Sequence, residues 1–243
     1  MPISETGLAA AAAELQSAKL IAPVLHTITV VVIIVLVFGV GFTAVLAGAS
    51  PAGNIFGSRR NIMVLYGAMI VVEWGLVYYI WHFGIRHSGL SLRGLIGGRW
   101  STPIDVVRDV AIAVAILYAS GQLDHAFIAI LRPEPVTSLD VLLPSTALEL
   151  TFWLFVSFTA GICEEVIFRA YLQRQFTAIT HSAIAGILLQ AMLFGAGHAY
   201  QGTNAVLIAA EAVLLGVIAH WRKSLRPGMI AHIGSDFIAG ALR

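Results

Sequence analysis

Charged residues are scarce in this chain. Of its 243 residues, 14 are Lys or Arg and 13 are Asp or Glu, so charged residues make up 11%, whereas a soluble domain has roughly 25%. Residues 21–58 and 175–210 contain none at all, and each stretch exceeds the ~20 apolar residues that cross a bilayer. This composition excludes an ordinary soluble domain and predicts an all-α, polytopic transmembrane helix bundle.

Other features are missing as well. A single cysteine, Cys163, excludes an internal disulfide framework, and its apolar surroundings argue against a nucleophilic thiol. The sequence has no basic arm of the kind that would indicate a nucleic-acid partner. Residues 1–20 lack the positive n-region of a signal peptide, so we interpret the apolar stretch that follows as a retained span. No internal repeat of the kind common in transporters is visible.

Length and charge predict seven membrane spans, with an eighth as the alternative if 123–131 forms a short or re-entrant segment. Gly89–Trp100 is typical of an interfacial amphipathic helix, and Asp105, Arg108 and Asp109 suggest a charge network at a helix entry. We divide the chain into an N-terminal segment (1–20), N-terminal transmembrane helices (21–145) and a catalytic transmembrane core (146–243). The predicted spans are 21–48, 62–83, 104–122, 146–172, 182–199, 203–221 and 227–242.

With seven spans, most positive charge falls on one side of the membrane. The positive-inside rule then places the N-terminus in the cytoplasm, and we expect an integral protein of a bacterial plasma membrane. Glu73 and Glu211 each stand alone in an apolar span. Such residues can be pathway groups, but the simpler interpretation is a local partner inside the bundle.

Two adjacent carboxylates, Glu164 and Glu165, lie in a predicted span, and Arg169 follows. Intramembrane ionisable residues predict a functional site by default. Residues four apart share a helix face while successive residues diverge by about 100°. Glu165 and Arg169 are therefore expected to form a structural ion pair, which leaves Glu164 as the candidate general base.

Two histidines complete the candidate site. His198 ends one uncharged span, and His232 lies four residues before Asp236 in the last span. Depth arithmetic at 1.5 Å per residue allows the three clusters to meet only if the hairpin that turns near residues 178–180 projects into water. Glu164, His198 and His232 would suit a catalytic Zn²⁺. Alternatively, Glu164 and His198 activate water without metal while His232 stabilises an oxyanion. The His-Glu-x-x-His spacing that favours a metal is absent, and both alternatives stay open.

These residues resemble a known family. Glu164-Glu165…Arg169, Phe194…His198 and His232…Asp236 are similar to the three motifs of the CAAX-protease and bacteriocin-processing (CPBP) intramembrane proteases, which include CAAX prenyl protease 2 and abortive-infection proteins. The resemblance covers about residues 146–242. The family carries Asn or Asp at the position of Asp236, and an ionised Asp cannot itself donate to an oxyanion.

The resemblance implies an intramembrane endopeptidase that acts on a membrane-associated protein or peptide within the lipid bilayer. It implies catalytic roles for Glu164, His198, His232 and Asp236, and a structural pair of Glu165 and Arg169. The family is often labelled metalloprotease but has also been interpreted as metal-free, so the expected cofactor is either Zn²⁺ or none. The substrate-binding residues and the substrate stay undetermined. The competing hypotheses are a non-catalytic scaffold or immunity protein and, third, a transporter.

Overall fold

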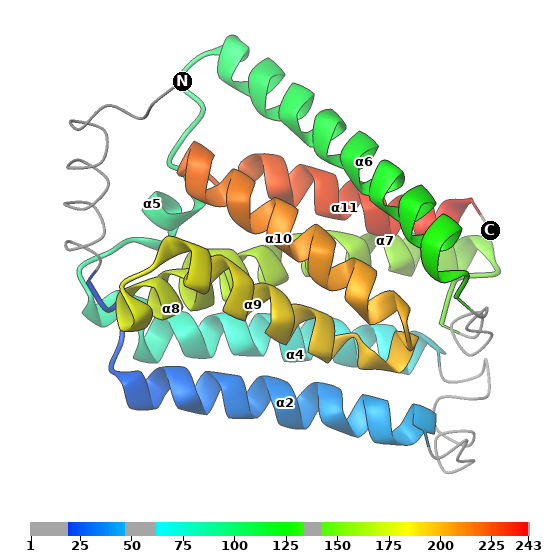
Figure 1. The fold of residues 1–243 in the computed structure, drawn as a ribbon, viewed down its shortest axis with the longest axis horizontal. Helices are drawn as coiled ribbons and strands as arrows, with labels where there is room; N and C mark the ends of the chain where they lie inside the picture. The colour runs from blue at the N-terminus through cyan, green and yellow to red at the C-terminus, as the bar shows by residue number, and fades with distance from the viewer. Residues whose placement is uncertain (1–18, 47–61, 134–141, 243) are drawn as a thin grey trace.

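The computed structural model describes residues 19–46, 62–133 and 142–242, and of residues 40–46 only the backbone. Every regular element in these ranges is helical, as predicted (Figure 1). The elements are α2 (Val24–Leu46), α4 (Ile62–Phe83), η2 (Ile85–His87), α5 (Leu92–Ile96), α6 (Pro103–Leu131), α7 (Ala147–Glu164), η4 (Glu165–Leu172), α8 (Gln173–Thr180), α9 (Ala183–Gly197), η5 (Ala199–Gln201), α10 (Asn204–Arg222) and α11 (Arg226–Ala241).

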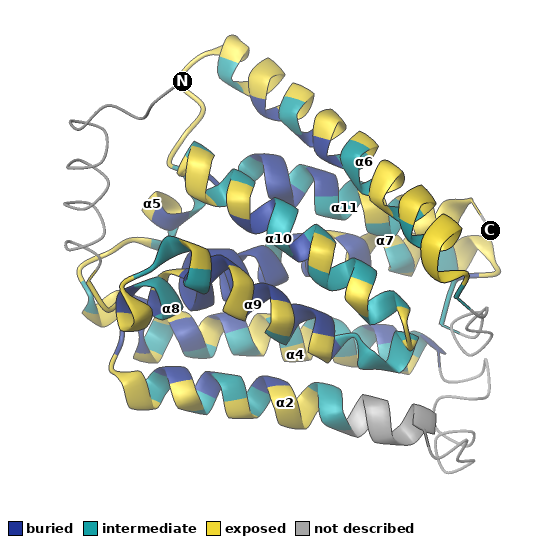
Figure 2. Ribbon diagram, viewed as in Figure 1, coloured by how far each residue is buried: buried dark blue, intermediate teal, exposed yellow. Residues whose placement is uncertain are grey.

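The burial pattern is that of a bundle in an apolar solvent. Helices α2 and α4 lie along one edge and α6 along the opposite edge, and all three expose many residues (Figure 2). Much of that exposed surface is apolar, such as Leu25, Val71 and Ile130. The centre of the bundle is instead formed by the end of α7 and by η4, whose residues are almost all buried. Such an arrangement matches a helical bundle surrounded by lipid.

Within the described residues, three helices are long and apolar enough to cross a membrane: Ile62–His87, Ala147–Thr180 and Asn204–Arg222. Val24–Gly39 and Ala183–Gly197 are shorter apolar helices. Taken with the composition, these helices indicate an integral membrane protein. The count of seven or eight spans stays a prediction, as does the division into an N-terminal part and a catalytic core.

Two boundaries differ from those predicted. Residues 123–131 form no separate segment, because α6 runs uninterrupted from a capping box at Thr102 and Asp105 to Leu131. The helix that was predicted to end at residue 172 continues to Thr180. His181 then adopts the left-handed backbone conformation, which ends the helix. The predicted interfacial helix is limited to the five residues of α5.

The middle of the long helix is π-helical. Residues Glu165–Leu172, all buried, adopt this wider helix between α7 and α8. A π-helical turn holds more residues than an α-helical turn and appears frequently at functional sites. The sequence argument assumed 100° per residue throughout, and the helix type differs here, although the expected pairing of Glu165 with Arg169 is present. Glu164 is the last residue of α7 and Glu165 the first of the π-helix, so the change of helix type falls between the two carboxylates.

Small residues let the neighbouring helices approach closely. A Cβ on Gly161 of α7 would lie 2.8 Å from the backbone nitrogen of Ile233 in α11. A Cβ on Gly195 of α9 would lie 2.7 Å from the carbonyl oxygen of Ala205 in α10. Real Cβ atoms do not approach other atoms so closely, so glycine is required at both positions. The contact at Gly161 brings His232, the neighbour of Ile233, against the end of α7.

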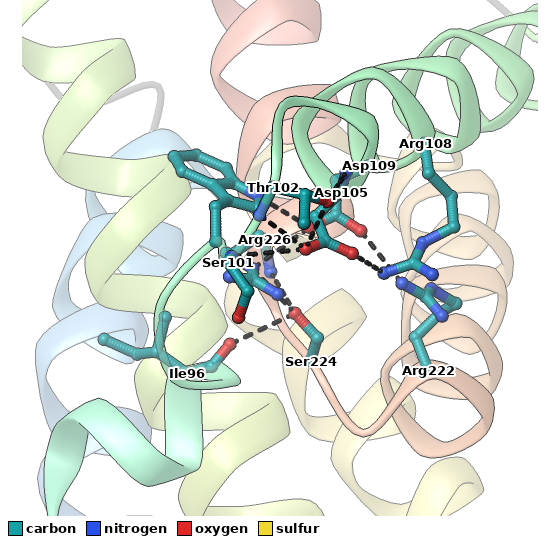
Figure 3. A network of polar contacts seen from close by, with 10 residues as sticks. Ile96, Ser101, Thr102, Asp105, Arg108, Asp109, Arg222, Ser224 and Arg226 are labelled. Carbon is teal, nitrogen blue, oxygen red and sulfur yellow. Dashed lines mark hydrogen bonds and ion pairs between the residues drawn. The ribbon is translucent and has the colours of Figure 1, made fainter.

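A buried aspartate joins the ends of three helices (Figure 3). Asp109 of α6 is fully buried. Its carboxylate forms ion pairs with Arg222 and Arg226, each at 3.0 Å, and accepts a hydrogen bond from the Trp100 indole N–H at 2.8 Å. We call these four residues the Asp109 network. The predicted helix-entry network is thus divided, because Arg108 pairs with Asp105 at 2.8 Å while Asp109 faces the turn between α10 and α11.

Candidate active site

The three sequence motifs converge at the centre of the bundle. Glu164 and Glu165 lie halfway along the Ala147–Thr180 helix, and His232 reaches them from α11. His198 follows the last residue of α9. Phe194, one turn earlier on α9, has its ring 6.0 Å from the ring of His232 and 4.7 Å from the ring of His198. It therefore packs against both imidazoles.

The Glu165 carboxylate lies in a cationic environment. Arg169 Nη1 is 3.0 Å from Glu165 Oε1, and both side chains are fully buried. The guanidinium also stacks on the Phe194 ring, 4.6 Å from its centroid. Burial of either charge alone would be strongly unfavourable, whereas a close pair offsets much of the desolvation penalty. This geometry suits a structural role for both residues.

His232 is surrounded by carboxylates. Its Nδ1 lies 3.2 Å from Glu165 Oε1, and its Nε2 lies 3.5 Å from Glu164 Oε2 and 3.7 Å from Asp236 Oδ2. Ionised carboxylates only accept hydrogen bonds. A ring that faces them with both nitrogens is therefore suited to carry hydrogen on both, as the imidazolium. The arrangement provides a fixed positive charge beside Glu164.

His198 has a different environment. Its Nδ1 lies 2.9 Å from the Phe194 carbonyl oxygen, and because a carbonyl only accepts, Nδ1 must donate. The neutral tautomer then leaves the Nε2 lone pair free to accept a proton. Within the described ranges no hydrogen bond joins His198 to Glu164, so the structure brings Glu164, His232 and Asp236 together directly and holds His198 one aromatic ring away.

This donor set does not fit a bound metal ion. Among the described residues no group of three His, Cys, Asp or Glu side chains is arranged to hold one. The predicted ligands Glu164 and His232 face each other, and both nitrogens of His232 already contact carboxylates. A metal ligand needs a free nitrogen lone pair. We therefore derive no catalytic step through a metal.

Two residues outside the predicted site also lie close to it. Glu73 of α4 lines one small cavity together with Glu164; the sequence marked it only as a lone charge in an apolar span. The Tyr200 ring lies 5.9 Å from the His198 ring. Burial raises the pKa of Tyr200 to about 12, so its hydroxyl keeps its proton. In the sequence, the only indication that Tyr200 lies near the site is its position two residues after His198.

The fold and the site together define a membrane-embedded helical protein with a buried carboxylate–histidine centre. Residues 146–238 match the sequence model of the family described as type II CAAX prenyl endopeptidase Rce1-like. The predicted resemblance to the CAAX-type protease family is thereby confirmed for this segment, which contains all three motifs. The matched family is one of proteases, that is, hydrolases. Comparison with curated proteins and with solved structures finds no match to the chain.

Proposed function

We propose that the protein is an intramembrane endopeptidase that hydrolyses a peptide bond of a membrane-associated protein or peptide. The observation that carries this proposal is the buried contact between Glu164 and His232, flanked by Asp236 and by the Glu165–Arg169 pair. A carboxylate beside a fixed cation suits a reaction that needs a base and a stabilised oxyanion at the same place. The match of residues 146–238 to a protease family supports the same reaction class.

In the proposed mechanism Glu164 removes a proton from water, and the resulting hydroxide attacks the substrate carbonyl carbon. The free Nε2 of His198 can accept a hydrogen bond from the same water and orient it. The Nε2–H of His232, whose nearest carboxylate oxygens are 3.5 and 3.7 Å away, donates to the developing oxyanion. Glu165 accepts from Nδ1 at 3.2 Å and thereby orients the ring. Asp236, 3.7 Å from Nε2, stabilises the positive charge of the ring, which is a role that an ionised carboxylate can fill although it cannot itself donate to the oxyanion.

The proposed location is the bacterial plasma membrane, with the N-terminus in the cytoplasm. The apolar helices and the excess of positive charge in one set of loops support this orientation. A cysteine placed near the N-terminus of a Cys163→Ala background should react with an impermeant maleimide only after the cells are opened. Labelling of intact cells would reverse the proposed orientation.

The test of function is substrate trapping. Membranes containing Glu164→Gln protein are expected to retain uncleaved partners that the wild type converts, and comparison of protein N-termini should reveal the cleavage sites. Glu149→Gln, the same change in the first turn of the same helix, is the matched control and should cleave like the wild type. Equal cleavage by Glu164→Gln and wild type would remove the proposed base. Absence of any wild-type cleavage product would favour the scaffold hypothesis.

A further inference from the structure

Glu73 is a buried acid that the mechanism above does not use. It is the only Asp, Glu, Lys or Arg in α4 (Ile62–Phe83) and lies near the middle of that helix. Its Oε2 atom is buried and has no hydrogen-bond partner among the described residues. Buried polar groups in native structures nearly always have a partner, so an exception calls for an explanation. It also lies outside the family match at 146–238.

Glu73 lies close enough to Glu164 for the two carboxyl groups to interact. Both side chains line a cavity of about 30 Å³ between α2, α4 and the α7–η4 junction, and the remaining lining residues are apolar. A space of this size admits a single water molecule. Those apolar lining residues are Ile34, Val37, Phe38, Val72, Leu76, Ile167 and Phe168.

The charges around the site are unbalanced. Among the described residues, five carboxyl groups (Glu73, Glu164, Glu165, Glu211 and Asp236) interact with two buried cations, Arg169 and His232. An unpaired carboxylate in so apolar a place is unfavourable enough that it takes up a proton instead. Within the described ranges Glu73 forms no ion pair, and its buried oxygen has no hydrogen-bond partner. The titratable groups that face it are Glu164 and Cys163 on α7, His232 and Asp236 on α11, and Tyr200 on η5.

The proposed hydrolysis also needs a proton donor for the leaving amine, and in the mechanism above only Glu164, after it has taken a proton from water, could serve. His198 donates its Nδ1 hydrogen to the Phe194 carbonyl and presents a free acceptor, and His232 donates to carboxylates. An amide nitrogen must be protonated as its bond to carbon breaks. A neutral carboxylic acid opposite the base fits this need, as in enzymes where two carboxyl groups share one proton.

We propose that Glu73 is a further catalytic residue, the general acid that protonates the leaving nitrogen. This inference rests on the proposed peptidase function. Glu164 takes one proton from water, and hydroxide forms the new C–O bond. As the C–N bond breaks, the neutral Glu73 carboxyl gives its proton to nitrogen and becomes a carboxylate. The proton held by Glu164 then crosses the cavity to Glu73, which restores both groups and leaves one acid and one amine per water consumed.

The first test measures cleavage of the substrate that the Glu164→Gln trap identifies. Glu73→Gln should lower kcat about 10²-fold with little change in KM, as expected for loss of one acid–base group. The wild-type rate should fall at high pH, where a general acid has lost its proton, and the Glu73→Gln profile should lack this alkaline limb. Glu73→Asp should recover part of the rate. Glu149→Gln, which makes the same change in the first turn of α7, is the matched control with an unchanged profile.

A Glu73→Gln enzyme with a wild-type rate and an intact alkaline limb would overturn the proposal, as would loss of activity that only follows loss of folded protein. A second test needs no substrate. The infrared difference spectrum of wild type minus Glu73→Gln at neutral pH should contain the C=O stretch of a protonated carboxyl, and carboxylate bands alone would overturn the assignment. Failure of the proposed function is distinguishable, because it appears as no dependence of cleavage on Glu164.

Discussion

Two buried charge networks share helix α11 and differ in the sign of the charge that is in excess. In the Asp109 network one carboxylate receives two arginines and an indole N–H, so both of its oxygens are paired. In the candidate site several carboxyl groups crowd around His232 and Arg169, and Glu73 has a buried oxygen without a partner among the described residues. Arg226 and His232 are six residues apart, about 9 Å along the helix axis.

The difference indicates a structural role for the Asp109 network and a chemical role for the candidate site. In the Asp109 network every carboxylate oxygen is paired and the excess charge is positive, on the partly exposed Arg222 and Arg226. Such a network is explained by holding helix ends together. A network with surplus acids at the centre of a membrane bundle is unfavourable for stability by itself, which is the general reason that intramembrane ionisable groups mark functional sites. The predictions below test that division, beginning with the largest expected effect.

Glu165→Ala should destabilise the protein most. It leaves the fully buried Arg169 without its carboxylate partner, and removing one member of a buried pair costs about 3–5 kcal/mol. Thermal unfolding in detergent should show the loss. The double variant Glu165→Gln with Arg169→Met removes both charges and should recover most of the stability. A Glu165→Ala protein as stable as the wild type would contradict the structural role of the pair.

Gly161→Ala should damage both stability and activity. The added methyl would meet the backbone of Ile233, so α7 and α11 must separate and His232 must move away from Glu164. Overpacking of this kind costs about 1–3 kcal/mol, and cleavage should fall about tenfold or more, since small misplacements at a site have large effects on rate. Gly67→Ala, with open space around its Cβ position, is the matched control and should be neutral or stabilising.

Asp109→Asn should lower stability but not the rate of the folded enzyme. The amide still accepts hydrogen bonds but no longer offsets the charges of Arg222 and Arg226. Because these side chains are 17% and 13% exposed, water can replace part of the loss, and we expect about 1–3 kcal/mol. Unfolding midpoints and cleavage rates normalised to folded protein separate the two effects. A changed normalised rate would mean that the networks are coupled through α11.

Trp100→Phe should have the smallest effect. It removes one hydrogen bond to Asp109 but keeps an aromatic face under Arg226. Loss of a single such bond is worth about 0.5–1.5 kcal/mol. A modest fall in the unfolding midpoint with unchanged cleavage is expected. A loss as large as that of Asp109→Asn would mean that the indole N–H, rather than the arginines, holds this network.

The sequence was sufficient for the parts of the fold that depend on composition and spacing. Uncharged runs predicted the apolar helices, and the i, i+4 spacings brought Glu165 to Arg169 and Asp236 to His232. The sequence was insufficient where tertiary packing decides. No residue pattern in Glu165–Leu172 predicts a π-helix. All eight residues are buried among the neighbouring helices, and such packing is not visible in a single sequence. The proximity of Glu73 to Glu164 depends on how α4 packs against α7, which a single sequence does not reveal.

The central claim is tested most directly by comparing Glu164→Gln with Asp109→Asn in one assay of the trapped substrate, with cleavage normalised to folded protein. The account predicts that Glu164→Gln remains folded and loses about 10²-fold or more of the rate, as expected for loss of a general base, whereas Asp109→Asn is less stable and cleaves at the wild-type rate. Wild-type cleavage by Glu164→Gln together with an inactive but folded Asp109→Asn would contradict the account.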